Sequence, residues 1–404
     1  MVLRLRRMRP RHWLWLAAVS LFLLTSCAPQ VMTVEVTRLV TDAAASAASA
    51  TPAPPLEVTR LVTAEVTRIV TETVTVEVTV TPASPGSAER PLQLLLAPAF
   101  PPQILQDRAA PLAEAVGDAV GGEVAVGILD DEAAIQTVLC GAPRETMALL
   151  SPLAAARANV ACGSQVLATG VQVDGLSWTA GMVVVRRDSG LAELADLDGR
   201  IWAVAEENSL ANYQYMQALF VELDVTPAEI RFFPGDNTAL LAVYNGEADF
   251  ATATYLPPVL PFAEQEWVYG EDDPELWRRL GIPPARSGQG FVVVNGPPEF
   301  GGYRIRDARA GIFDTTPAIF AESEILMLTP PLPVQTLVVG AEFPLQMARR
   351  VETALVAFGA SEQCAASLCA PDFLSWQGVI PAADVDYDPL RLIVRNLESA
   401  AEEE

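Results

Sequence analysis

The sequence predicts an α/β fold with largely parallel sheets, in a chain long enough for two lobes. After Pro91, short apolar runs typical of strands alternate with stretches whose apolar residues recur at helical spacing. Such alternation is characteristic of α/β folds with parallel sheets. The residues that follow a candidate N-terminal leader number 378 of 404, which is enough for two lobes that each bury a core.

We expect strands at ten runs, each rich in apolar residues: 92–98, 124–129, 146–152, 165–171, 181–187, 201–206, 229–235, 249–255, 324–329 and 336–340. A helix is expected over 209–223, where apolar side chains recur at helical spacing. The next helix is expected near 237–245, with Asp236 and Asn237 as its caps and Gly246 at its end.

The first 26 residues have the pattern of an export leader. Five arginines precede an apolar run over 13–24, and that run is shorter than the ~20 residues that span a bilayer. The run closes on Leu24-Thr25-Ser26-Cys27, which resembles the lipobox of bacterial lipoproteins, whose cysteine receives diacylglycerol. We therefore expect a mature protein that begins at Cys27 and is held by lipid on the extracytoplasmic face of the cell membrane. The alternative is an ordinary signal anchor with a buried cysteine.

Residues 27–90 are expected to form a linker between the membrane and the folded part. The heptapeptide EVTRLVT stands at 35–41 and 57–63, and EVTRIVT follows at 65–71, with an Ala/Ser/Thr/Pro tract between the first two copies. The repeats have few large apolar residues and are bracketed by Pro and small residues, as in linkers. The alternative is a β-rich stalk or a contact with the cell wall, because alternating Val and Thr also suit strands.

Composition excludes several kinds of chemistry. The chain has a net charge of −24, or −29 once the five leader arginines are removed, which argues against nucleic acid and anionic lipid headgroups as partners. His12 in the leader is the sole histidine, and the chain has no lysine. A histidine-based triad, a Schiff-base lysine, a P-loop lysine and a histidine-ligated metal are therefore excluded. We expect no enzyme, no cofactor and no metal site.

Four cysteines remain after Cys27, an even number in a protein expected to be exported, where disulfides persist. The spacings pair Cys140 with Cys162 and Cys364 with Cys369, and these are the disulfides we expect. Four buried free thiols are the alternative. A zinc site would need closer clustering than these spacings give.

The stretch 181–255 contains short sequence motifs that are similar to those of a known protein family. It contains VVVRRDSGLAELADLDGRIWAV, then NSLANY, then PGDNTALLAVYNGEADFATATY. These motifs resemble those of the phosphate/phosphite/phosphonate substrate-binding proteins of ABC transporters, and weaker matches extend the resemblance over about 91–397. The resemblance implies a two-lobed clamshell of the type II periplasmic-binding-protein kind, in which each lobe is a mostly parallel sheet flanked by helices.

By this resemblance, lobe one comprises 91–185 plus 335–400, and lobe two comprises 186–334. The stretch 257–312 has no counterpart among the best-known members and is expected to be an insertion. Its arginines Arg304, Arg306 and Arg309 are expected on a solvated or salt-bridged helix face. The alternative is that these three arginines bind an anion.

The resemblance also implies a ligand site where helix starts follow strands, since free N–H groups and the helix dipole suit an anionic group. The residues expected there are Ser151, Asn208, Ser209, Tyr213, Asp236, Asn237 and Tyr255. The chain departs from the family pattern at this site. Ser-Thr-Ser-Gly-Tyr becomes residues 209–213 (SLANY), which removes two hydroxyls, and His-Asp becomes Asp236-Asn237.

We therefore expect a monomeric, lipid-anchored solute receptor of an ABC importer, with permease subunits as partners. Its solute would be a small anion such as a phosphonate, phosphite or phosphate ester. Asp236, Glu206 and Glu207 favour a solute that also carries an amine or several hydroxyls. The alternatives are a surface sensory or adhesion protein that keeps the clamshell, or a binder of a sulfonate, an amine or a cofactor precursor.

Overall fold

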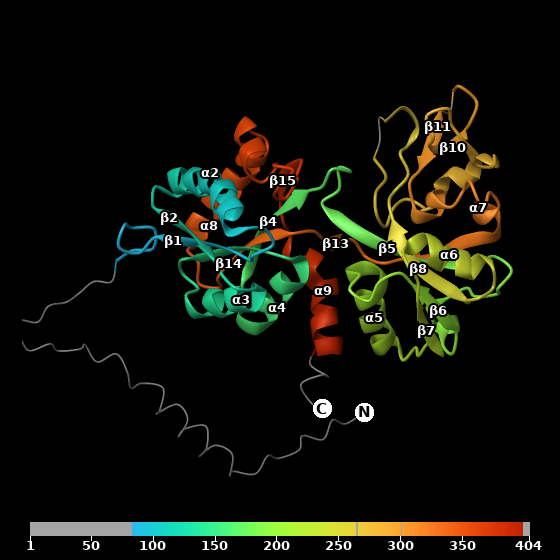
Figure 1. Ribbon diagram of the computed structural model, residues 1–404, viewed down its shortest axis with the longest axis horizontal. Coiled ribbons are helices and arrows are strands. Elements are labelled where there is room, and N and C mark those ends of the chain that lie inside the picture. The colour runs from blue at the N-terminus through green and yellow to red at the C-terminus, as the bar shows by residue number, and fades with distance from the viewer. Residues whose placement is uncertain (1–82, 264–265, 300, 399–404) are drawn as a thin grey trace, which may run out of the picture. The chain divides into compact units, whose positions relative to one another are not determined.

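The computed structural model describes residues 83–263, 266–299 and 301–398, which belong to one compact unit beginning at Ala83. They form two lobes, each built on a mixed sheet with helices (Figure 1). The leader 1–26, Cys27 and the Val/Thr repeats lie outside the described residues. The end of the expected linker is already attached to lobe one, because Glu123 donates a backbone hydrogen bond to Gly86 and Arg90 pairs with Glu145 at 2.7 Å.

The sheet of lobe one has six strands in the order β15-β4-β14-β3-β1-β2. Its members are β1 (Leu92–Leu96), β2 (Val124–Ile128), β3 (Thr146–Leu150), β4 (Gln165–Val171), β14 (Thr336–Val339) and β15 (Gly378–Pro381). Strand β1 runs parallel to β2 and β3, whereas β14 pairs antiparallel with both β3 and β4. The carboxyl ends of β1, β2 and β3 therefore meet at one edge of this lobe.

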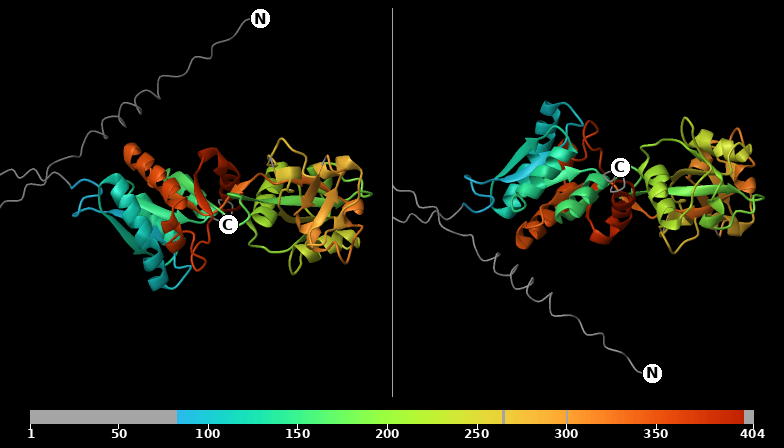
Figure 2. Two further views of the ribbon diagram at one scale, coloured as in Figure 1. Left: turned by 90° about the horizontal axis from the view of Figure 1, so that it is seen from above. Right: turned by 90° about the horizontal axis from the view of Figure 1, so that it is seen from below.

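Helices cover both faces of this sheet because its strands are apolar on both sides. In β1, Leu94 and Leu96 pack into one core with α2 (Pro102–Val120) and α8 (Leu345–Gly359). Leu95 points to the opposite face, where α3 (Glu132–Gly141) and α4 (Pro152–Cys162) supply the core. This period of two is what a fully buried strand requires. Figure 2 shows both lobes from two further directions.

The main sheet of lobe two has the strand order β12-β5-β8-β6-β7. Its members are β5 (Trp178–Arg186), β6 (Ile201–Val204), β7 (Glu229–Phe232), β8 (Phe250–Tyr255) and β12 (Ser323–Leu328), and the short β13 (Leu332–Pro333) pairs with β5. Strands β6, β7 and β8 are parallel. One face packs against α5 (Tyr215–Leu223) and the other against α6 (Asp236–Tyr244) and α7 (Ile319–Glu322).

Two details differ from the sequence prediction. Strand β5 was expected in lobe one up to residue 185, but it pairs with β8 and β12, so the chain changes sheets between β4 and β5. Both sheets are mixed rather than mostly parallel. The strands that run against the parallel set are β14 and β15 in lobe one and β5 in lobe two.

The described part of 257–312, the stretch expected to be an insertion, contains a small antiparallel sheet of β9 (Ala285–Arg286), β10 (Val292–Asn295) and β11 (Gly302–Ile305). Its arginines do not share one helix face. Arg309 is fully buried and contacts Asp307 and Glu275, whereas Arg304 lies over the ring of Phe291. Arg306 donates to a backbone carbonyl. The salt-bridged interpretation holds for Arg309.

The C-terminal helix α9 (Asp388–Ile393) packs between helices of both lobes. Leu390 and Ile393 are buried in the core that also contains residues of α4 and α5. Just beyond α9, Asn396 donates a hydrogen bond of 3.0 Å to the carbonyl of Ala218 in α5. No helix within the described ranges is long and apolar enough to cross a membrane.

Candidate functional site

Lobe two has a polar cavity of about 400 Å³ at the carboxyl ends of its parallel strands β6, β7 and β8. In open α/β sheets this edge is where ligands bind. The cavity is lined by residues that follow these strands or begin the next helices, namely Ala205, Glu206, Ser209, Asn212, Pro234, Gly235, Asp236, Asn237 and Thr254.

The cavity floor includes a π-helical turn over Leu210–Gln214 that leads into α5. The carbonyl of Ser209 accepts from the N–H groups of both Tyr213 and Gln214, and the Ser209 hydroxyl accepts from the N–H of Asn212 at 3.3 Å. The backbone N–H groups of Leu210 and Ala211 have no hydrogen-bond acceptor within the described residues. Turns of this kind are frequent at functional sites.

Two threonines of β8 fasten the turn to the sheet. Thr252 donates to the carbonyl of Asn212 at 2.6 Å, and the Asn212 side-chain amide donates to the Thr254 hydroxyl at 3.3 Å. Asn212 lies over Gly181, where a Cβ would stand 2.7 Å from its Oδ1, so only glycine permits this approach. Asn212 is 5% exposed, and its buried Oδ1 has no hydrogen-bond partner among the residues that the structure describes. Such an unpaired acceptor is a cost that stable folds rarely carry.

The start of α6 forms the opposite wall of the cavity. Its N-cap is Gly235, so Asp236 and Asn237 lie in the first turn rather than at the cap. The Asp236 carboxylate accepts from the N–H of Thr254 at 2.8 Å, which ties it to β8. The Asn237 side chain lies against Gly311. The N–H groups of Asp236 and Asn237 have no acceptor within the described residues and are left for a ligand.

The two tyrosines expected on the cavity wall lie in the cores instead. Tyr213 stacks on Trp202, with ring centroids 5.4 Å apart, and its hydroxyl accepts from Gln217. Tyr255 is 1% exposed and donates to the carbonyl of Pro274. Burial raises the pKa of both phenols. Asn208 is exposed and does not line the cavity.

Ser151 lies in lobe one, at the N-cap of α4, and its polar groups already have a partner. Its N–H donates to Glu132 Oε1 at 2.6 Å and its hydroxyl donates to Glu132 Oε2 at 2.8 Å. Ser151 is next to a second cavity, of about 560 Å³, where β1, β2 and β3 end. The residues lining that cavity do not include Ser151 itself.

The structure joins the cysteines in the expected pairs. Cys140 in α3 is bonded to Cys162 in α4, with Cα atoms 5.6 Å apart, and Cys364 is bonded to Cys369, with Cα atoms 5.0 Å apart. The second bond immediately precedes the loop that carries Phe373 to the lobe-one cavity. Within the part of the chain that the structure describes, no group of three or more His, Cys, Asp or Glu side chains is placed to hold a metal ion.

A family model described as "ABC transporter, phosphonate, periplasmic substrate-binding protein" matches residues 94–387. The chain belongs to this family. The match covers both lobes and both cavities, and the family is one of transport substrate-binding proteins rather than of enzymes. The two lobes, with cavities at the carboxyl ends of their strands, are consistent with the clamshell of a periplasmic binding protein.

Three solved structures are similar to the chain at low identity. A protein from Xanthomonas citri bound to chloride ion is 14% identical, over 78% of this chain and 99% of that chain, with a TM-score of 0.41. A binding-protein component of an ABC phosphonate transporter from Pseudomonas aeruginosa is 15% identical, over 78% and 88%, with a TM-score of 0.37. PhnD1 from Prochlorococcus marinus, solved with methylphosphonate, is 13% identical, over 76% and 98%, with a TM-score of 0.36.

These likenesses, with TM-scores below 0.5, add nothing to the family assignment. No curated protein matches the chain.

Three polar side chains of the lobe-two cavity, those of Thr254, Asn212 and Glu206, were not predicted as site residues. Thr254 is near the end of a strand, at the edge of the sheet where the cavity lies, and Asn212 is part of the family motif over 209–213. Glu206 follows β6 directly and was considered for its charge rather than as a lining residue. Position at the carboxyl end of a parallel strand was the available indication for Thr254 and Glu206.

Proposed function

We propose that this chain is the lipid-anchored solute receptor of an ABC importer, and that it binds a small solute whose acidic head is held in the lobe-two cavity. The head is phosphonate-like or phosphate-ester-like. The binding event favours the closed form of the two lobes, and that form docks on permease subunits. The anchor is the lipid on Cys27, outside the described residues.

The observation that carries this proposal is the convergence of donors in the lobe-two cavity. The hydroxyls of Ser209 and Thr254 accept hydrogen bonds from Asn212, which leaves their own protons free for an oxyanion. Free N–H groups at the starts of two helical segments, over 210–211 and 236–237, add donors that need no side-chain charge. Hydroxyls and backbone N–H groups of this kind are common partners of phosphoryl oxygens.

The cavity also limits what the rest of the solute is. The Asp236 carboxylate accepts from the N–H of Thr254 through one oxygen, and its second oxygen makes no hydrogen bond within the described residues. Glu206 is exposed at the same cavity. A bare inorganic phosphate would meet both carboxylates, whereas a solute that also carries an amine or hydroxyl groups would donate to them. The proposal therefore favours organic phosphonates or phosphate esters with polar donors over inorganic phosphate.

A thermal-shift screen over phosphonates, phosphite, phosphate esters, sulfonates and amines identifies the solute, because a ligand that binds the native state raises the melting temperature. Calorimetry then compares the wild type with Ser209→Ala and Thr254→Val. Each variant removes one hydroxyl from the cavity, and each is expected to weaken binding of the acid by about tenfold, the value of one hydrogen bond to a charged group.

Ser189→Ala is the matched control. The Ser189 hydroxyl also accepts from a backbone N–H in lobe two, that of Leu191 at 3.2 Å, but Ser189 does not line the cavity. This variant is expected to bind like the wild type. Undiminished affinity in Ser209→Ala and Thr254→Val, for an acid that the wild type binds, would place the site elsewhere.

A further inference from the structure

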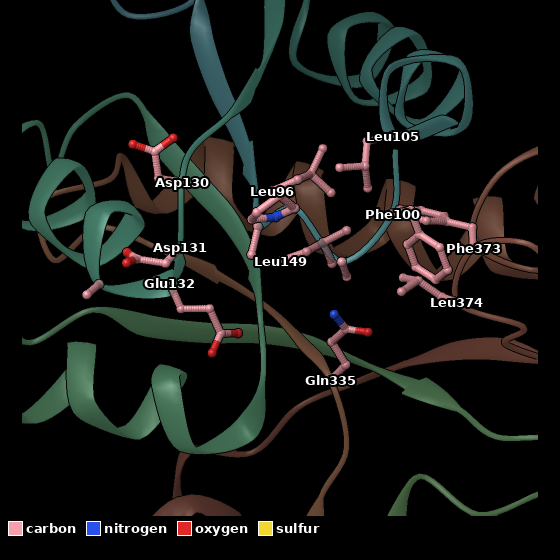
Figure 3. Close-up of a pocket in the computed structure, with 14 residues that line it drawn as sticks. Leu96, Phe100, Leu105, Asp130, Asp131, Glu132, Leu149, Gln335, Phe373 and Leu374 are labelled. Carbon is pink, nitrogen blue, oxygen red and sulfur yellow. The ribbon is translucent and has the colours of Figure 1, made fainter. Parts of the chain in front are cut away.

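The lobe-one cavity differs in chemistry from the lobe-two cavity. Its wall is mainly apolar, and Phe100 and Phe373 meet edge to face there with ring centroids 5.9 Å apart. Figure 3 shows these rings and Leu374 on one side, and three carboxylates, those of Asp130, Asp131 and Glu132, on the other. The remaining labelled residues are Leu96, Leu105, Leu149 and Gln335. No arginine is among the residues that line it.

The three carboxylates have different partners. Asp131 caps α3 by accepting from the N–H of Ala134 at 2.7 Å. Asp130 makes no hydrogen bond or ion pair within the described residues. Glu132 reaches across to the next helix and accepts from both the N–H and the hydroxyl of Ser151, at 2.6 and 2.8 Å.

Glu132 thereby occupies the position that an acidic ligand would need in lobe one. A helix start favours a negative group because its first N–H groups are unpaired and the dipole is positive there. At α4 the chain's own carboxylate supplies that group, in a two-point contact with Ser151. A second anion at the same place would find these donors already bound to Glu132, and it would be repelled by Glu132, Asp130 and Asp131.

We propose that Glu132 determines the solute specificity of lobe one: it closes the start of α4 to acids, so that the neighbouring cavity receives an apolar organic substituent of the solute. This inference rests on the proposed function, in which lobe two holds the single acidic head. The substrate class is then a monoacidic solute with a sizeable apolar substituent, rather than inorganic phosphate, phosphite or a compound with two acidic ends.

The size and lining of the cavity agree with this class. A volume of about 560 Å³ is within the usual range for small-molecule sites. Burial of a phenyl-sized group against Phe100, Phe373 and the leucines removes apolar surface from water on both partners. Methylphosphonate is too small to make these contacts. Comparing it with a phosphonate that carries a phenyl group therefore separates the binding of the acidic head from the binding of the substituent.

The test is calorimetry with inorganic phosphate, methylphosphonate and 2-phenylethylphosphonate. The wild type is expected to bind the phenylethyl compound at least tenfold more tightly than methylphosphonate. In Glu132→Ala, which frees Ser151, affinity for inorganic phosphate and methylphosphonate is expected to rise at least tenfold. Asp130→Ala removes a carboxylate from the same cavity without touching Ser151, and it is expected to change these affinities less than threefold.

Equal gains in Glu132→Ala and Asp130→Ala would overturn the inference, because they would reflect net charge rather than occupation of the helix start. No gain in Glu132→Ala would overturn it as well. If Glu132→Ala does not fold, Glu132→Gln, which keeps an acceptor for the Ser151 N–H but no charge, must still bind phosphate at least threefold more tightly than the wild type. An unchanged affinity in that variant contradicts the inference.

The outcomes separate this inference from the proposed function. If the wild type binds phosphonates and loses them in Ser209→Ala, the proposed function stands whatever Glu132 does. If the wild type binds no acid but Glu132→Ala gains phosphate binding, Glu132 closes the start of α4 as inferred, but the proposed acidic head, and with it the monoacidic substrate class, is wrong. As a direct readout, phosphate should shift the amide resonance of Ser151 in Glu132→Ala and leave it unchanged in the wild type.

Discussion

Replacement of Arg309 by Met should destabilise lobe two by about 3–5 kcal/mol at neutral pH, the usual cost of breaking a buried ion pair from one side. Arg309 is fully buried and holds two carboxylates in place. It contacts Asp307 through two hydrogen bonds of 3.0 Å and Glu275 through one of 2.7 Å. Asp307 and Glu275 are only 3% and 8% exposed, so both would stay out of water when the cation is lost.

The loss of stability in Arg309→Met should depend on pH, and Glu275 sets the direction of that dependence. Burial by itself raises the pKa of Glu275, but Arg309 and Arg278 outweigh it and hold the pKa below the ordinary value of 4.5. A carboxyl with a depressed pKa contributes stability above its unfolded pKa and loses it as the pH falls through the folded value. In Arg309→Met the charge that lowers the pKa of Glu275 most is gone, so this pKa rises. Protonation of Glu275 as the pH falls then reduces the destabilisation of the variant.

Urea unfolding followed by tryptophan fluorescence tests this, because the buried Trp277 packs on Phe320, and the Arg309 guanidinium lies over the Phe320 ring. The deficit of Arg309→Met relative to the wild type should be larger at pH 7.5 than at pH 5. Arg144→Met is the control, since Arg144 and its partner Glu342 are 62% and 57% exposed and such pairs contribute less than about 1 kcal/mol. Equal deficits in the two variants, or a deficit of Arg309→Met that grows on acidification, would refute the reasoning.

Three further predictions concern the anchor, a disulfide and a core tyrosine. Cys27→Ala should leave the protein unprocessed or released from the membrane fraction, and a variant that is still matured and lipid-labelled would contradict the anchor. Replacement of Cys140 and Cys162 by Ala should cost about 3 kcal/mol in denaturant unfolding, as expected for a bond that closes a separation of 22 residues; an unchanged midpoint would exclude a stabilising bond. Tyr213→Phe should bind the solute within twofold of the wild type, because its hydroxyl meets Gln217 rather than the cavity, whereas a tenfold loss would return Tyr213 to the site.

Buried parallel strands were predictable because a strand that is covered on both faces must be apolar throughout. The run over 92–96 lies in β1 between two helical layers, and four of its five residues are leucines. Strands β9 and β15 were not expected because they are short, contain exposed residues and are defined mainly by their pairing. The position of β5 in lobe two also depends on pairing with distant strands, which its composition does not specify.

Three of the seven residues that the resemblance placed at the site, Ser209, Asp236 and Asn237, line the lobe-two cavity. Ser209 and Asp236 follow strands at the edge where a ligand is expected, and both line the lobe-two cavity. Tyr213 could not be assigned from its spacing, since the π-helical turn rotates it onto Trp202 in the core. The contact of Glu132 with Ser151 joins side chains 19 residues apart, and nothing local in the sequence indicates it. The acidic run Asp130-Asp131-Glu132 after a strand was the only available indication.

Hydrogen exchange in the presence and absence of the solute found by the screen tests the central claim most directly. A solute whose acidic head is held in lobe two must engage the N–H groups of Leu210, Ala211, Asp236 and Asn237, which have no acceptor within the described residues. The account predicts slower exchange at these four amides at saturating solute, while the amide of Ser151, already bound to Glu132, changes little. Unchanged exchange at all four amides, with tight binding measured on the same sample, would contradict it.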